Sequence, residues 1–127
     1  MLALIAGTGA LPGLLAEGLR AAGTAFVVCE MEGFPADVQG EEERLAFRLE
    51  TLGRFLGELA ARNVQKVCMA GTVRRPVLDP GLIDDATVPL IDRLRRAMAR
   101  GDDGTLREIV ALFEERGLSV VGAAEIR

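Results

Sequence analysis

Residues 2–12 read LALIAGTGALP, a wholly apolar run followed at once by two glycines that are one residue apart. The apolar run predicts a buried parallel strand over Leu2–Ala6. From Leu11 to Ala22 apolar residues recur at helical spacing, and Pro12 falls in the first turn, where its missing N–H costs little. The stretch therefore predicts a strand, a glycine-containing loop and a helix in direct succession.

The rest of the chain continues this alternation. Apolar runs predict four further strands, at Ala25–Glu30, Leu45–Leu49, Gln65–Ala70 and Leu118–Val121. Helical spacing predicts three further helices, over Thr51–Arg62, over Leu90–Arg100 and from Thr105 to the residue before Gly117. Such alternation predicts an α/β fold, a Rossmann-like doubly wound three-layer sandwich with a mostly parallel five-stranded sheet, in one domain over residues 1–127.

Composition excludes several classes of function. The net charge of −4 argues against general nucleic-acid binding. The chain has no histidine, which removes histidine-based acid–base catalysis and histidine metal sites. Cys29 and Cys68 fall in apolar runs and indicate buried thiols in a reducing cytoplasm. No run approaches the roughly 20 apolar residues of a transmembrane helix.

The first candidate site is the loop after the first strand. In a doubly wound sheet, ligands bind beyond the carboxyl ends of the strands, so we expect Gly7, Gly9, Ala10 and Leu11 to contact a ligand. Glycines let the backbone approach a ligand, and the following helix offers free N–H groups. The alternative is a plain tight turn. A nicotinamide cofactor is disfavoured, because Pro12 stands where G-x-G-x-x-G requires its third glycine.

The second candidate site follows the strand that ends at Ala70. Here Gly71 and Thr72 precede an arginine pair, Arg74 and Arg75. Guanidinium groups at this edge of the sheet would neutralise a phosphate or pyrophosphate. The alternative interpretation is an exposed basic turn held by a proline.

The third candidate is the aspartate pair Asp102 and Asp103. Carboxylates of this kind bind divalent metals such as Mg²⁺. Negative charge also stabilises the start of a helix, and this second interpretation is the stronger of the two. No serine or cysteine has a histidine partner, so the sequence assigns no catalytic residue.

Taken in order, these motifs resemble the bacterial UDP-2,3-diacylglucosamine pyrophosphatases of the DUF1009 type. The opening Leu4–Pro12 resembles the start of that family, and Ala70–Pro76 is similar to its A-G-x-V-x-R-P segment. Arg100–Asp103 matches its R-G-D-D segment, and Leu118–Ala123 with Glu125 resembles the V-V-G-A-x-E ending of its N-terminal domain.

The resemblance implies a Rossmann-like N-terminal domain that binds a nucleotide-sugar lipid, in a protein that also has a C-terminal domain carrying the catalytic aspartate. Full-length members hydrolyse UDP-2,3-diacylglucosamine to UMP and 2,3-diacylglucosamine 1-phosphate with Mg²⁺, in lipid A biosynthesis in Gram-negative bacteria. It also implies a cytoplasmic location at the inner face of the inner membrane, with peripheral membrane contact and a homodimer as further expectations.

Within that resemblance, Arg75 is the family-type arginine and a better candidate contact than Arg74. The C-terminal domain is absent from this chain, so we expect it to be inactive alone. The alternative prediction is a free-standing Rossmann-like module for nucleotide binding or for interaction, without catalysis.

Overall fold

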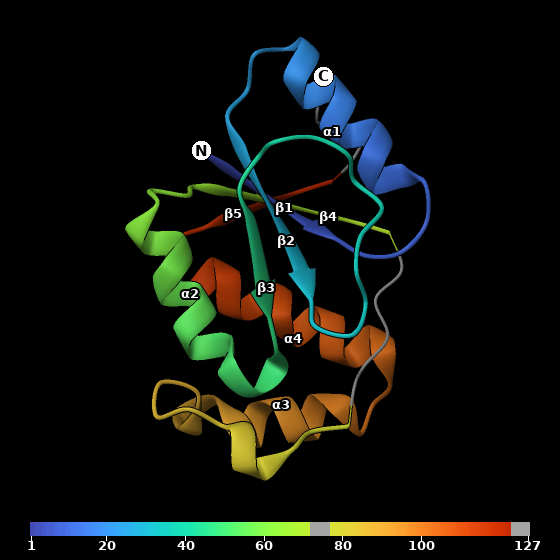
Figure 1. The fold of residues 1–127 in the computed structure, drawn as a ribbon. Helices are drawn as coiled ribbons and strands as arrows, with labels where there is room; N and C mark the ends of the chain where they lie inside the picture. Colours follow the sequence, from blue (N-terminus) through green and yellow to red (C-terminus); the bar gives the residue numbers. More distant parts are fainter. Residues whose placement is uncertain (72–76, 123–127) are drawn as a thin grey trace.

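The computed structural model describes residues 1–71 and 77–122 (Figure 1). The strands of the described residues are β1 (Leu2–Ala6), β2 (Phe26–Met31), β3 (Arg44–Phe47), β4 (Lys66–Ala70) and β5 (Ser119–Val121). The α-helices are α1 (Leu11–Ala21), α2 (Leu52–Ala61), α3 (Ile91–Met98) and α4 (Asp102–Glu115), and short 3₁₀ helices lie at η1 (Leu49–Thr51), η2 (Pro80–Leu82) and η3 (Val88–Leu90). None of these helices is long and apolar enough to cross a membrane.

The sheet has the strand order β3-β2-β1-β4-β5, and each of its four pairings is parallel. The chain runs outward from β1 through β2 to β3, and then returns to place β4 on the other side of β1. This reversal is the doubly wound order that the alternation predicted. The predicted sheet of five strands is therefore confirmed, and its described pairings are all parallel rather than mostly parallel.

Alternating side chains of β1 supply both faces of the sheet. Leu2 and Leu4 pack with Ala16 and Leu19 of α1 on one face, whereas Ile5 points to the opposite face, which α2 and α4 cover. Figure 1 shows α1 on one side of the sheet, α2 and α4 on the other, and α3 outside α4. The three layers follow from the period-two alternation of a strand that is buried on both faces.

Predicted boundaries are wrong at β3, which ends at Phe47 rather than at Leu49 of η1, and at α4. The helix α4 begins at Asp102 rather than at Thr105, so most of the predicted interruption Gly101–Gly104 is helical. Gly101 takes a φ of 96°, a left-handed conformation that turns the chain sharply between α3 and α4. Asp102 and Asp103 then occupy the first turn, where their negative charge interacts favourably with the positive end of the helix dipole.

The described part of the connection between β4 and α3 packs against the start of α2. The Thr87 hydroxyl accepts a hydrogen bond from the Gly53 amide at 2.9 Å and donates one to Asp84 at 2.5 Å. The buried Glu50 carboxylate accepts a hydrogen bond from the Asp79 amide at 3.1 Å. These contacts hold the connection against the start of α2, which follows the carboxyl end of β3.

Candidate ligand-binding cleft

The loops that follow β1 and β4 meet at the carboxyl edge of the sheet. These strands are neighbours, but after β1 the chain goes to α1 on one face, and after β4 it goes to α3 and α4 on the other. The Gly7 amide donates a hydrogen bond to the Ala70 carbonyl at 2.8 Å, which joins the two loops at their starts. Their divergence opens a crevice at the topological switch point, where sheets of this class bind ligands.

Gly71 makes this meeting possible. Its φ is +86°, and a Cβ at this position would lie 2.7 Å from the Thr8 carbonyl oxygen and 2.9 Å from the carbonyl carbon of Gly7. Any larger residue would push the two loops apart. Gly9, with a φ of +103°, has open space where a Cβ would stand, so its role is conformational. The two glycines therefore shape the cleft in different ways.

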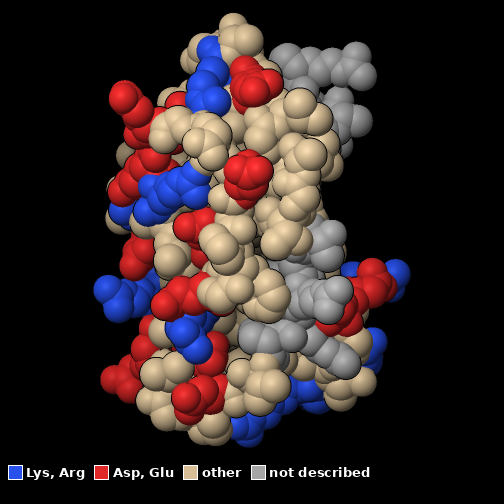
Figure 2. All heavy atoms as spheres, turned by 45° about the vertical axis from the view of Figure 1, so that its right-hand side comes forward, with Lys and Arg blue, Asp and Glu red and all other residues tan. Residues whose placement is uncertain are grey.

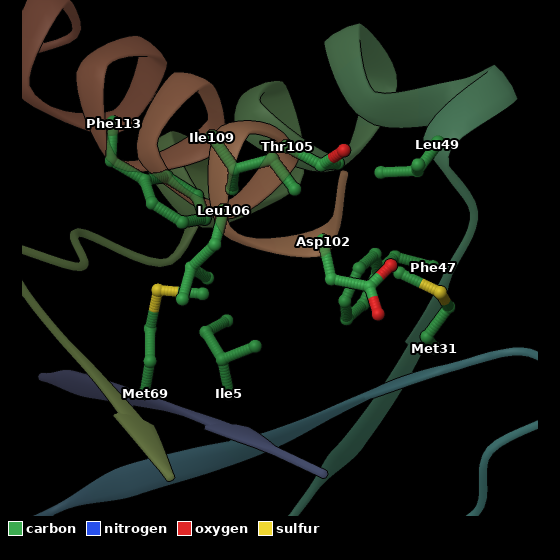
Figure 3. Close-up of a pocket in the computed structure, with 10 residues that line it drawn as sticks. All are labelled: Ile5, Met31, Phe47, Leu49, Met69, Asp102, Thr105, Leu106, Ile109 and Phe113. Atoms are coloured by element: carbon green, nitrogen blue, oxygen red, sulfur yellow. The ribbon is translucent and has the colours of Figure 1, made fainter. Parts of the chain in front are cut away.

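A cleft of about 310 Å³ lies between this edge of the sheet and the first turn of α4. It is lined by Ile5, Met69, Ala70, Gly71, Asp102, Asp103 and Leu106. Four of these residues also border a smaller apolar cavity of about 40 Å³ beneath α4. Figure 3 shows Ile5 and Met69 pointing from the strands toward Leu106 and Phe113 on α4. The cleft therefore has an apolar floor and a polar rim.

The helices α1 and α4 differ in charge at their amino ends. The first turn of α1 contains no acidic residue, and its N-cap residue Ala10 provides no side-chain hydrogen bond to the amides of this turn. The first turn of α4 contains Asp102 and Asp103, and Asp103 pairs with Arg107 at 3.1 Å. A helix dipole favours an anion where no carboxylate already balances it, so the α1 side is the better place for a phosphate group.

The structure brings some of the described candidate residues together at the start of the cleft. Gly7 is buried beneath the loop, whereas Gly9, Ala10 and Leu11 are exposed at the start of α1. Gly71 touches this loop and also lines the cleft, where Asp102 and Asp103 lie on the α4 side. Thr72, Arg74 and Arg75 lie outside the described residues, so their contact with a ligand stays a prediction.

Sequence reasoning missed the apolar residues that line the cavity under α4. Met31, Phe47, Leu49 and Met69 are contributed by the ends of β2, β3 and β4 or by the residues just beyond them. The available signal was their position at the carboxyl end of each apolar run, combined with the alternation of faces along a strand. That signal becomes visible only when the order of the strands is known.

Glu30 stands where a ribose-binding acid would fall in a dinucleotide-binding domain. Its carboxylate instead accepts a hydrogen bond from the Ala36 amide at 2.8 Å and pairs with Arg44 at 3.4 Å. These contacts anchor the loop between β2 and β3. Glu30 therefore has a structural role, and this further disfavours binding of a dinucleotide cofactor.

Comparison with known proteins agrees with the architecture. The family model described as the LpxI N-terminal domain matches residues 1–127, the whole chain. The UDP-2,3-diacylglucosamine pyrophosphatase LpxI of Caulobacter vibrioides is 34% identical over 125 residues. That alignment covers 98% of this chain and 45% of the relative, so the chain spans a little under half the length of the curated relative that it matches. The chain, with its two glycine loops at the sheet switch point, therefore belongs to the LpxI N-terminal domain family.

Proposed function

We propose that this chain is the substrate-binding domain of a UDP-2,3-diacylglucosamine pyrophosphatase, which hydrolyses UDP-2,3-diacylglucosamine to UMP and 2,3-diacylglucosamine 1-phosphate in lipid A biosynthesis. The observation that carries the proposal is the meeting of the two glycine loops at the switch point of a doubly wound sheet. The relative's name supplies the substrate. The proposal includes a C-terminal catalytic partner domain and a location at the cytoplasmic face of the inner membrane.

The loop from Gly7 to Leu11 would hold the pyrophosphate. Its glycines allow close backbone approach, and the first turn of α1 carries no acidic residue. Arg74 and Arg75, which the sequence places just beyond Gly71, would neutralise the phosphate charge. Holding the charged group in one orientation lowers the entropic barrier for attack by water, while the cleavage itself falls to the partner domain.

A magnesium ion is part of the family expectation, and the described residues do not fit one. They contain no group of three or more aspartate, glutamate, histidine or cysteine side chains that could hold a metal ion. Asp102 and Asp103 lie at the positive end of α4, and Asp103 is already paired with Arg107. We therefore expect the partner domain to hold the metal.

Ligand titration with a thermal unfolding readout tests the proposal. A ligand that binds only the folded state raises the melting temperature by mass action. We expect UMP and UDP-N-acetylglucosamine to raise it, and NAD(H) and NADP(H) to leave it unchanged. A shift with the nicotinamide cofactors and none with uridine nucleotides would establish the dinucleotide alternative instead. The protein extended by a C-terminal domain should hydrolyse UDP-2,3-diacylglucosamine, and the present chain alone should not.

A further inference from the structure

The helix α3 concentrates positive charge in an acidic protein. The segment 91–100 carries Arg93, Arg95, Arg96 and Arg100 against one acidic residue, whereas the whole chain has a net charge of −4. The apolar side of α3 is buried in the core through Ile91, Leu94 and Ala97. Figure 2 shows Lys and Arg side chains along the lower margin of the molecule, where Figure 1 places α3.

Three of these arginines line one groove. Arg93, Arg96 and Arg100 recur at intervals of three and four residues, so they project from one side of the helix. Together with Glu108 of α4 they line a hollow of about 470 Å³ on the surface between the two helices. The groove therefore presents several guanidinium groups in one direction.

Only one end of the groove is neutralised. Arg93 donates to Glu108 at 2.6 Å and to Glu115 at 2.6 Å. These two carboxylates raise the pKa of Arg93, and Arg93 in turn lowers the pKa of Glu115. Among the described residues no carboxylate lies within ion-pair distance of Arg96 or Arg100. Within residues 1–71 and 77–122, the positive charge at the Arg100 end of the groove is therefore available for another partner.

Gly104 places that end of the groove beside the cleft. A Cβ on Gly104 would lie 2.7 Å from the Arg100 Cβ and 3.0 Å from the Ala97 carbonyl oxygen, so the end of α3 lies directly against the first turn of α4. Asp102 and Asp103, in the same turn, line the cleft. Arg100 and the cleft therefore lie at the same end of α4.

We propose that Arg96 and Arg100 dock the protein on an anionic phospholipid surface with the cleft close to the headgroups. Both side chains are exposed, and the hollow is an open groove, which suits many phosphates on a plane better than one enclosed phosphate ion. The acidic remainder of the chain is repelled by such a surface, so this face alone turns toward it. The choice of a bilayer rests on the proposed function, since a diacylated substrate resides in one.

Vesicle co-sedimentation tests this docking without any substrate. Wild-type chain should bind vesicles of phosphatidylcholine and phosphatidylglycerol in equal parts, not vesicles of phosphatidylcholine alone, and high salt should release it. The double variant Arg96→Glu/Arg100→Glu should bind at least about 30-fold more weakly, since each basic residue near an anionic bilayer contributes about a fivefold factor. The control Arg54→Glu/Lys66→Glu makes the same charge change on α2 and at the amino end of β4, and should bind as the wild type does.

Equal binding to both kinds of vesicle, or an equal loss in the control variant, would overturn the proposal. If the double glutamate variant fails to fold by circular dichroism, Arg96→Gln/Arg100→Gln replaces it, with an expected loss of about 30-fold. Uridine nucleotide titration of the same variants separates the two ideas. A variant that loses vesicle binding but keeps its thermal shift with UMP supports both the docking surface and the proposed function. If the wild type does not bind vesicles, the docking proposal is wrong, and the proposed function is unaffected.

Discussion

At the scale of single residues, the cleft depends on positions where a side chain is not tolerated. Gly71 combines a φ of +86° with contact against the Gly7–Thr8 backbone, whereas Gly57 in α2 has nothing within 4 Å of where its Cβ would stand. The two positions are therefore a matched pair. One needs glycine for both conformation and space, and the other needs it for neither.

Replacing Gly71 by alanine should lower the free energy of unfolding by about 1–3 kcal/mol, because the new Cβ is strained at positive φ and meets the Thr8 carbonyl oxygen. The same change should weaken uridine nucleotide binding by displacing the first loop. Gly57→Ala should instead raise stability by roughly 0.5–1 kcal/mol, since alanine is the better helix former. Urea unfolding of the two variants measures the contrast, and equal effects would contradict it.

The two cysteines give a second test at this scale. Both are buried, and burial raises the pKa of the Cys29 thiol to about 12. Because only the thiolate reacts quickly, we expect almost no labelling of either cysteine by iodoacetamide near neutral pH in the folded protein, and full labelling in urea. Rapid labelling of the native protein would show that these strands open readily.

At the scale of elements, ion pairs brace the packing of α3 on α4. Arg93 reaches Glu108 and Glu115 from the neighbouring helix, and neither carboxylate is near it in sequence. The hydrogen bond from Arg93 holds the pKa of Glu115 below its usual 4.5. A carboxyl group with a depressed pKa stabilises the fold above its unfolded value and loses that contribution as pH falls through the folded value.

Stability should therefore fall as the pH is lowered below about 4.5, and Arg93→Gln should reduce the part of this dependence that comes from the brace. The effect should be modest, because the pair is exposed to solvent and screened by salt. Urea unfolding at several pH values measures it. Arg54→Gln, which removes an exposed pair within α2, is the control and should change the pH dependence less.

At the scale of the whole molecule, the cleft is built from segments distant in sequence. Ile5 comes from β1, Met69 to Gly71 come from the end of β4 and just beyond it, and α4 supplies Asp102 and Asp103. These carboxylates are acidic groups on the α4 side of the cleft. The structure thus gives the aspartate pair an electrostatic role that its sequence neighbours do not reveal.

Asp102→Asn/Asp103→Asn should lower stability by only about 0.3–1 kcal/mol for each lost helix-end charge. Affinity for UMP in the absence of metal should stay equal or rise, because negative charge leaves the cleft. Urea unfolding measures the change in stability, and calorimetric titration with and without Mg²⁺ measures the affinity for UMP. A several-fold weakening that appears only with Mg²⁺ would instead assign the pair to a metal, which was the other interpretation of these residues.

Much of the fold was predictable, and the errors have identifiable causes. The strand and helix order followed from periodicity, and the boundaries of β1 and α1 were correct to within one residue. The start of α4 was misplaced because Gly101 and Gly104 suggested a break, whereas Gly104 is tolerated in a helix that packs tightly on Arg100. The short helices η2 and η3 were missed because the contacts that hold this connection come from Glu50 and Gly53, far away in sequence.

The sequence by itself determined the α/β alternation, the doubly wound class and the glycine loop, because these depend on local periodicity and on the conformational freedom of glycine. It also indicated the family, through motifs in a fixed order. Only the tertiary structure decided that Gly71 seats against the Gly7 loop, that Glu30 is occupied in anchoring a loop, and that Arg96 and Arg100 remain without carboxylate partners among the described residues. Those contacts join residues that are distant in sequence. Which of these residues come together depends on how the layers pack, and no local sequence pattern predicts it.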